Sequence, residues 1–488
     1  MSRVRSLTRS TLAAAALAAA VVSGCTSSPS GAPPDLTHPP ELGPPPSVKL
    51  PPVVKRTLDN GLTLMVVEQH ELPVADFLLV VHTGGEADPA DRGGLASLTA
   101  DMLDEGTTTR SALQIADQAA YLGVDIGTRS GWDESMVTLH TTTAQMDSAL
   151  ALFGDVALHP AFPDADLARV RKDRLTALLQ LKDRGPAIAD RAFAAIVYGP
   201  HNPYGHPLTG TDRSISAISR ADLQHFYQMY YRPNNATLIV VGDVQPDDIE
   251  RRAKQLFGTW TRQTVPATTY GQTPARTARR IYLIDKPGAA QSSFRIGDVG
   301  VARSTPDYFP IEVMNTILGG SFSSRLNQNL RETHGYTYGA GSGFSMRHEA
   351  GPFTARAEVV AAKTDSALVQ FLKELRGIRD TVSTAELSRA KHLLELQLPG
   401  QFETTGDIAR QLVPMVLYDL PGDFYDRYVA HVEAVTQADV QRVAREDIKP
   451  DSMDVVIVGD RTLVEPGLEA LHVGPLEMRG LNGQAVHP

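Results

Sequence analysis

The stretch Arg232-Pro-Asn-Asn-Ala-Thr-Leu-Ile-Val-Val-Gly-Asp243 decides the fold, because its pattern returns near the end of the chain. The second occurrence is Lys449-Pro-Asp-Ser-Met-Asp-Val-Val-Ile-Val-Gly-Asp460, which lies 217 positions later. In both, a proline and a polar turn precede a run of β-branched and apolar residues, the pattern of a buried strand. The chain is therefore expected to carry one structural unit twice.

Segments far from these two strands repeat with the same offset. Residues 64–68 match residues 281–285, again 217 positions apart. Phe77 and Phe294 have the same separation. Distant segments that share one register favour a duplication. The alternative is that two unrelated α/β domains share such sequence patterns by chance.

The two copies are predicted to be α+β units, each with a largely antiparallel sheet packed against helices. A strand pair should open the first copy, followed by a helix from near Gly93, a further strand and two more helices. These strands and later helices are expected at 62–68, 75–82, 135–141, 143–158 and 164–183. The predicted divisions are a first copy at 53–260, a polar linker at 261–279, a second copy at 280–473 and a tail at 474–488.

The N-terminal residues have the pattern of an export signal. Three arginines precede an apolar, alanine-rich run at 11–22, which predicts a secretory leader at 1–24. The leader ends Val22-Ser-Gly-Cys25, which resembles a bacterial lipobox, and Cys25 is the only cysteine of the chain. Lipidation of Cys25 is therefore expected, with the Pro- and Ser-rich residues 25–52 as a tether. In a Gram-negative host, Thr26 in place of aspartate would favour the periplasmic face of the outer membrane.

Composition limits the classes of function. The 488 residues include 42% hydrophobic residues and carry a formal net charge of -10, which fits a large globular protein and argues against nucleic acid as a partner. No segment after the leader is long and apolar enough to predict a membrane-spanning helix. A single cysteine excludes an intramolecular disulfide.

Several motifs resemble those of the M16 metallopeptidases, the family of insulinase, pitrilysin and the mitochondrial processing peptidase. They are Gly84-Gly-Glu-Ala-Asp-Pro89, the run from Gly93 to Thr107, Tyr198-Gly-Pro-His-Asn-Pro-Tyr-Gly-His206 and Leu318-Gly-Gly-Ser-Phe-Ser-Ser-Arg-Leu326. The resemblance covers residues 53–460 and implies two tandem units of this family's fold.

The resemblance also implies where a zinc site would lie. Active members carry His-x-x-Glu-His on the first helix, with two histidines on one helical face and a glutamate that polarises the metal-bound water. Those positions are Ser97, Ala100 and Asp101 here, and the position of the third ligand falls on Leu178 or its neighbour Ala177. Asp101 would be the only carboxylate left, so the sequence predicts a lost zinc site and no metal or other cofactor in this chain.

The second copy keeps a different signature of the family. In relatives, an arginine and a tyrosine seven residues apart face the zinc site and steady the oxyanion of the substrate. The matching residues are Arg331 and Tyr338, whose guanidinium and phenol are suitable donors for such an oxygen. The alternative is that Arg331 is a solvated charge on a helix and Tyr338 an ordinary aromatic residue of a strand, with no role in catalysis.

Three hypotheses follow. The first is a zinc-less, lipid-anchored subunit that pairs as a heterodimer with a zinc-containing M16 chain and helps it to act on peptides or unfolded segments. Substrate would bind partly by adding a strand to a sheet edge. The second is a scaffold or binding protein with no peptidase partner, and the third is an independent hydrolase with a rebuilt site.

Overall fold

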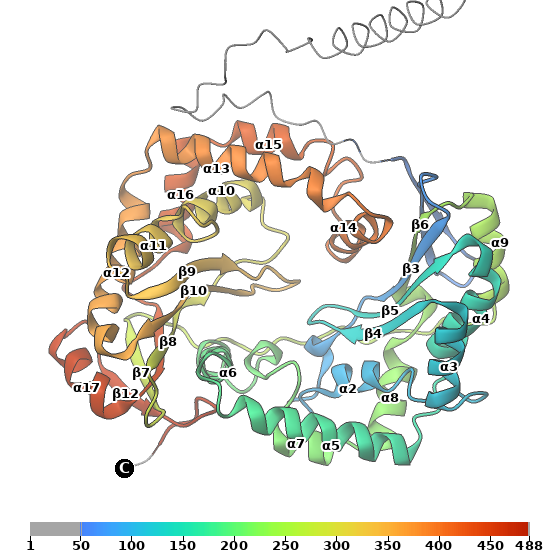
Figure 1. Cartoon of the computed structure of the whole chain (residues 1–488), viewed down its shortest axis with the longest axis horizontal. Helices are drawn as coiled ribbons and strands as arrows, with labels where there is room; N and C mark the ends of the chain where they lie inside the picture. Colours follow the sequence, from blue (N-terminus) through green and yellow to red (C-terminus); the bar gives the residue numbers. More distant parts are fainter. Residues whose placement is uncertain (1–48, 50, 487–488) are drawn as a thin grey trace, which may run out of the picture. The chain divides into compact units, whose positions relative to one another are not determined.

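The computed structural model describes Lys49 and residues 51–486. The leader, Cys25 and most of the tether therefore lie outside the described residues. Within the described part, helices and strands alternate in two sets of matching order (Figure 1). None of the described helices is long and apolar enough to cross a membrane.

The first copy is built on a six-stranded sheet with the order β1-β2-β6-β3-β5-β4. Only β2 and β6 run parallel, and the other neighbours are antiparallel. The strands are β1 (Val53–Thr57), β2 (Thr63–Glu68), β3 (Val74–Val81), β4 (Asp125–Ser130), β5 (Ser135–Thr142) and β6 (Ala236–Gly242).

The second copy repeats five of these strands in a sheet with the order β12-β7-β11-β8-β10-β9. Its strands are β7 (Arg280–Asp285), β8 (Gln291–Val299), β9 (Thr337–Phe344), β10 (Pro352–Val360), β11 (Asp454–Gly459) and β12 (Leu476–Arg479). Its edge strand β12 differs from β1, because it follows the other strands in the chain and runs parallel to β7. Strands β2 and β7 begin 217 residues apart, as do β3 and β8, so the register inferred from the sequence is the register of the sheets. The two α+β units with largely antiparallel sheets are confirmed.

One prediction about the first sheet is wrong. The two strands expected to open the copy as a pair are β2 and β3, but β1 precedes them and β6 lies between them, so they do not pair. Every residue of β6 is buried, so this strand, which comes last in the copy, occupies the centre of the sheet. A strand buried on both faces reads as a continuous apolar run, and such a run belongs in the middle of a sheet.

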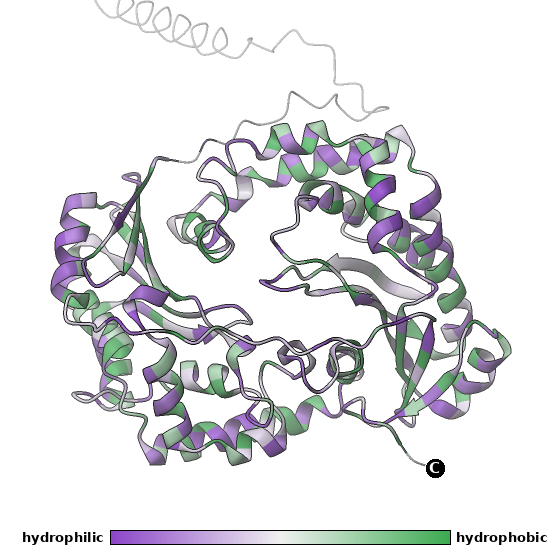
Figure 2. Ribbon diagram, turned by 180° about the vertical axis from the view of Figure 1, so that it is seen from behind, coloured by the Kyte–Doolittle hydropathy of each residue, from purple (hydrophilic) through white to green (hydrophobic). Residues whose placement is uncertain are grey.

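The helices follow the same duplication (Figure 1). The first copy has α2 (Leu95–Asp101), α3 (Ala112–Leu122), α4 (Met146–Leu158), α5 (Asp164–Leu181), α6 (Gly185–Tyr198), α7 (Asp212–Ala217), α8 (Arg220–Tyr230) and α9 (Pro246–Phe257). The second has α10 (Tyr308–Leu318), α11 (Arg325–Asn327), α12 (Thr364–Asp380), α13 (Thr384–Gln397), α14 (Thr405–Leu417), α15 (Tyr428–Ala434), α16 (Gln437–Asp447) and α17 (Arg461–Ala470). The helices are striped with hydrophobic and hydrophilic residues along their length, as expected where one face covers a sheet (Figure 2).

The two faces of the first sheet belong to different cores. On β3, Phe77 and Leu79 pack in a core made entirely of first-copy residues. Leu78 and Val80 point the other way and join a core that also contains Ile408 of α14, a helix of the second copy. This division follows from the alternation of side chains along a strand.

The second sheet receives a helix in return. Helix α6 of the first copy packs on β8 and β11, and Phe193 of α6 shares a small core with Tyr282 and Val456 of the second sheet. Helix α6 shifted by the repeat offset overlaps α14, so the exchanged helices are equivalent elements. Each copy therefore covers one sheet face of the other.

Candidate functional site

The helix that would carry the zinc motif begins at a constrained turn. Gly94 caps α2 with φ 90°, and a Cβ there would lie 2.8 Å from the backbone nitrogen of Gly210. The Asp88 carboxylate accepts the backbone N–H of Gly94 at 2.6 Å and that of Ala96 at 2.8 Å. Burial raises the pKa of Asp88 to about 7 in spite of these bonds. The start of α2, and with it the direction of Ser97 and Asp101, is fixed by these contacts.

The positions that replace the zinc ligands are held together by an arginine. Both terminal nitrogens of Arg174 donate to Ser97 Oγ at 3.1 Å, and Nη2 also donates to the Asp101 carboxylate. Nη1 further donates to the carbonyl of Thr209 at 3.1 Å. Ser97 is buried, whereas the side chain of Asp101 is 37% exposed. A guanidinium cation therefore bridges the two positions where the family places histidines.

The remaining two positions carry no donor atoms. Ala100 and Leu178 are fully buried among apolar side chains. Zinc requires thiolate, imidazole or carboxylate ligands, and Asp101 is the only such group among the four residues. The residues present do not fit a zinc ion, and an arginine already neutralises the one carboxylate.

Arg174 was not singled out in the sequence, although a signal existed. It lies four residues before Leu178 on α5, and positions four apart share one face of a helix. Arg174 lies one helical turn from Leu178, the position of a missing ligand, and Asp101 is an isolated carboxylate. This pattern indicates that the arginine cation takes the place of the metal.

The signature arginine of the second copy lies in an unusual turn. Arg331 belongs to a π-helical segment, Gln328–Thr333, a geometry often found at functional sites. Its guanidinium carbon lies 4.5 Å from the ring centre of Phe322, and its Nε lies 3.3 Å from a carboxylate oxygen of Glu332. The Phe322 side chain is 66% exposed. An aromatic platform thus positions this cation at the surface.

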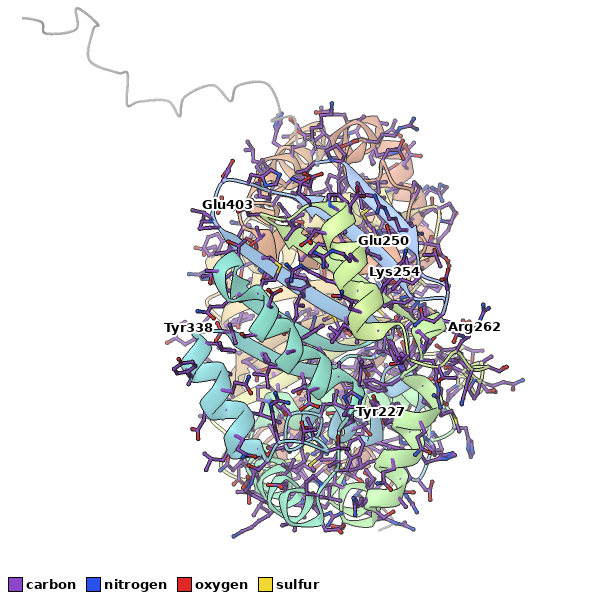
Figure 3. The ribbon with its side chains drawn as sticks, turned by 90° about the vertical axis from the view of Figure 1, so that its right-hand side faces the viewer. Tyr227, Glu250, Lys254, Arg262, Tyr338 and Glu403 are labelled. Atoms are coloured by element: carbon purple, nitrogen blue, oxygen red, sulfur yellow. The ribbon has the colours of Figure 1, made fainter. Side chains whose placement is uncertain are left out.

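Tyr338 lies near the start of β9, the edge strand of the second sheet. It is 91% exposed, and Figure 3 shows it at the margin of the molecule. The contacts of the Arg331 side chain among the described residues are to Phe322 and Glu332, and no hydrogen bond joins it to Tyr338. The pair therefore presents two separate donors to solvent.

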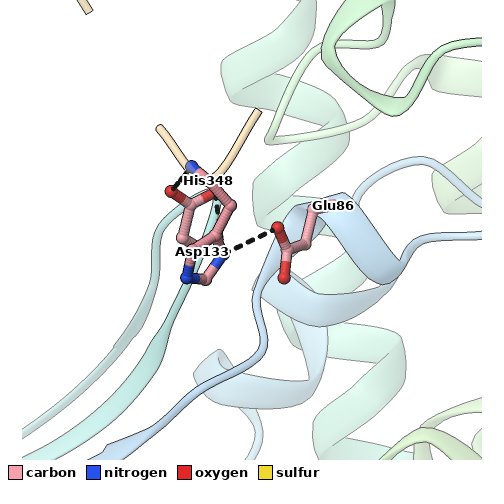
Figure 4. A group of neighbouring side chains, drawn as sticks. All are labelled: Glu86, Asp133 and His348. Atoms are coloured by element: carbon pink, nitrogen blue, oxygen red, sulfur yellow. Dashed lines mark hydrogen bonds and ion pairs between the residues drawn. The ribbon is translucent and has the colours of Figure 1, made fainter. Parts of the chain in front are cut away.

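A second cluster joins the two copies, and it was not predicted from the sequence. His348, in the loop between β9 and β10, faces Glu86 and Asp133 of the first copy (Figure 4). Its Nδ1 lies 3.2 Å from Glu86 Oε2 and 3.9 Å from Asp133 Oδ1. Its Nε2 bonds the carbonyl of Leu417 at 2.9 Å, and its backbone N–H donates to Asp133 at 2.9 Å.

Tyrosines complete the bonding of both carboxylates. Tyr270 donates to Glu86, while Tyr204 and Tyr418 donate to Asp133 at 3.1 Å and 2.8 Å. The three acidic and imidazole groups lie within 4.8 Å of one another, a spacing that a metal ion could bridge. The hydrogen bonds already made, and the nearby Arg347 guanidinium, instead describe a charge-balanced ion cluster.

The hydrogen bond to Glu86 raises the pKa of His348 to about 9, despite partial desolvation. His348 is therefore a cation at neutral pH. Because Nε2 faces a carbonyl and Nδ1 faces a carboxylate, both ring nitrogens donate. Two cations then offset two buried carboxylates.

Family models match both halves of the chain. The model described as insulinase (peptidase family M16) matches residues 64–211. The model described as peptidase M16 inactive domain matches residues 217–394.

Curated relatives match most of the chain. The chain is 26% identical over 388 residues to an uncharacterized zinc protease of Mycobacterium tuberculosis, which covers 76% of this chain and 87% of that protein. It is 24% identical over 335 residues to an uncharacterized zinc protease of Rickettsia bellii, with 68% of this chain and 80% of that protein covered.

Solved structures share the fold over a similar extent. A peptidase M16 inactive domain from Pseudomonas fluorescens has a TM-score of 0.78 and 29% identity, covering 84% of this chain and 98% of that one. A protease from Helicobacter pylori has a TM-score of 0.77 at 20% identity, covering 84% and 100%, and supports the fold alone. Together with the two matched family models and the duplicated sheets, these likenesses establish that the chain belongs to the M16 peptidase family.

Proposed function

We propose that this chain is a zinc-less M16 subunit that assists the zinc site of a partner M16 chain in the cleavage of peptides or unfolded segments. The observation that carries the proposal is the asymmetry between the copies. In the first copy, Arg174 bridges Ser97 and Asp101 where a metal would need histidines. In the second, Arg331 and Tyr338 remain exposed as donors.

The exposed donors match a defined chemical task. Hydrolysis of a peptide bond builds negative charge on the carbonyl oxygen, and positioned donors that meet this charge lower the barrier. Arg331 offers a cationic donor whose Nε already pairs with Glu332, so its terminal nitrogens are the ones we propose to meet the oxyanion. Tyr338 offers a hydroxyl on a side chain that is 91% exposed. At the family position this chain keeps one carboxylate, Asp101, which Arg174 already binds, so in this proposal the partner supplies the base and the metal ligands.

The assembly is proposed to be lipid-anchored through Cys25 at the cell envelope. The alternative, a scaffold with no peptidase partner, predicts that Arg331 and Tyr338 are remnants. The third hypothesis, an independent hydrolase, has no observation in its favour.

The experiment uses the purified chain and a zinc-motif M16 chain encoded in a neighbouring gene. This chain alone should contain no stoichiometric zinc by metal analysis. Mixing the two should yield activity on an unfolded peptide that neither shows alone. Arg331→Ala and Tyr338→Phe should each lower kcat by about 100- to 1,000-fold, the range for loss of one oxyanion donor.

Matched variants separate function from general damage. Arg356→Ala removes an exposed arginine from β10, and Tyr121→Phe alters a tyrosine that is 89% exposed on α3. Both should leave the activity of the mixture unchanged. Full activity in the Arg331 and Tyr338 variants would favour the scaffold alternative, and one tightly bound zinc in this chain alone would contradict the lost site.

A further inference from the structure

The loop between β9 and β10 reaches from the second copy into the first. Residues 345–351 form a tight turn, in which a Cβ on Gly351 would lie 1.6 Å from the carbonyl oxygen of Ser345. From this turn, Arg347 and His348 extend into first-copy contacts, and the carbonyl of Ala350 accepts the Tyr198 hydroxyl at 2.9 Å. Three residues of this one loop, Arg347, His348 and Ala350, therefore contact the other copy.

The receiving surface is acidic and aromatic. The Arg347 guanidinium lies over Trp132 at 4.5 Å and over Tyr204 at 4.4 Å. Its Nε and Nη1 are buried with no hydrogen-bond partner among the described residues, so the aromatic faces are their main contact. His348 next to it meets Glu86 and Asp133, which are 5% and 1% exposed.

A contact between buried charges is stable only while every charged group keeps its partner. Removing one partner of a buried hydrogen-bonded charge pair leaves the other charge unpaired, which costs far more than the pair contributes. Apolar packing, in contrast, weakens gradually. The copies also share apolar cores, so we expect only the part of their contact made by these buried charges to release as a unit.

We propose that residues 345–351 are a releasable clasp between the two copies and that the proton on the His348 imidazole keeps the clasp closed. Release would free the tip of the β9–β10 hairpin. Because Tyr338 lies on β9, the clasp and the exposed donor belong to one hairpin, and release would loosen the strand that carries the donor. The inference does not depend on the proposed function.

Burial lowers the pKa of Arg347, which adjoins the cluster. Titratable or charged groups from both copies face His348. They are Glu86, Asp133, Arg347, Tyr204, Tyr270, Tyr418 and His82. Burial raises the pKa of Tyr204, Tyr270 and Tyr418 far above 10, and burial lowers the pKa of His82 to about 4. The ordinary pKa of histidine, 6.5, rises to about 9 for His348 in the closed clasp. The proton's contribution is therefore complete below pH 6.5 and is lost as the pH rises through about 9.

Limited proteolysis with trypsin tests the proposal at residues 345–351. The bond after Arg347 should resist cleavage while the loop is docked and become accessible when it is released. The full chain is digested at pH 7 and pH 9.5, and cleavage between Arg347 and His348 is followed by mass spectrometry. A free peptide of residues 343–352 corrects for the pH dependence of trypsin. The corrected rate should rise about tenfold in the wild-type chain at pH 9.5.

Variants identify the group responsible. His348→Gln should be cleaved at the fast rate already at pH 7, with no further rise at pH 9.5, and Glu86→Gln should also be fast at pH 7. The control His334→Gln alters an exposed histidine that stacks on Tyr336 near the base of the same hairpin, and it should behave as wild type.

Three outcomes would overturn the proposal. The first is equal corrected cleavage of the wild-type chain at both pH values, and the second is a wild-type rate in His348→Gln. The third is simultaneous new cleavage throughout the chain with loss of near-ultraviolet circular dichroism at pH 9.5, which would mean global unfolding. The wild-type comparison needs no substitution, so a variant that fails to fold does not remove the test.

Discussion

Arg174 donates to Ser97 and Asp101, two positions that stand where the family's zinc ligands would be. Loss of a metal usually leaves a polar hole, because ligand positions face one another across the space of an ion. Here a guanidinium restores a cation at that point from within the chain. The Arg174 bridge is thus a structural contact between α2 and α5.

Replacement of this arginine should destabilise the first copy. Arg174→Met leaves Ser97 Oγ buried without a donor and Asp101 without its cation. The expected loss is about 1–3 kcal/mol, the usual cost of an unsatisfied buried polar group. Urea unfolding measures it, with Arg213→Met on the exposed side of α7 as the control. Equal midpoints for the two variants would show that the bridge does not contribute.

For single residues, the sequence predicted which residues occupy the motif positions better than it predicted which residues they contact. Ser97, Ala100, Asp101 and Leu178 could be placed because a motif with fixed spacing identifies them. Arg174 and His348 could not, because each acts through a partner that is 73 or more residues away in the chain. The spacing of one segment contains no information on which distant charge will meet it.

Among the elements, the exchanged helices α6 and α14 link the stability of the two copies. Each packs on a face of the other copy's sheet. The sequence predicted the strands that became β2, β3, β5, β6, β7, β8 and β11 from their alternation and their offset, but not β1, β4, β10 or β12. It did not predict the exchange or the central place of β6, because an apolar stripe on a helix does not identify the sheet that it covers.

Because the helices are exchanged, we expect a destabilising substitution in one copy to increase local unfolding in the other copy as well. Leu412 of α14 is fully buried in the core that includes the first sheet. Leu412→Ala should cost about 2–5 kcal/mol and should speed amide hydrogen exchange in β6 of the first copy as well as in the second. Phe193→Ala in α6 should have the reciprocal effect on β11.

The control for this pair is Leu396→Ala, since Leu396 is 52% exposed on α13. It should change the exchange of neither strand. If Leu412→Ala accelerates exchange only within the second copy, α14 does not support the first sheet.

For the whole molecule, attachment to the envelope is the testable expectation. Cys25 lies outside the described residues, and no described helix is long and apolar enough to span a bilayer. In bacteria grown with a labelled fatty acid, the chain should incorporate label and sediment with membranes, because acyl chains at Cys25 would bury apolar surface. Cys25→Ser should lose the label and leave the membrane fraction, whereas Ser27→Ala should not. Label retained by Cys25→Ser would exclude this site of acylation.

The reciprocal cover of the two sheets also bears on the origin of the chain. An ancestral polypeptide with a single unit would have had one sheet face without a covering helix. Two identical molecules could each have covered the other's sheet, which is the self-complementary contact of a symmetric homodimer. Gene fusion through a segment such as residues 261–279 would then have freed the two halves to diverge, one losing the metal and the other keeping its donors. A half expressed alone should aggregate or pair with itself, because its exposed sheet face still requires a helix.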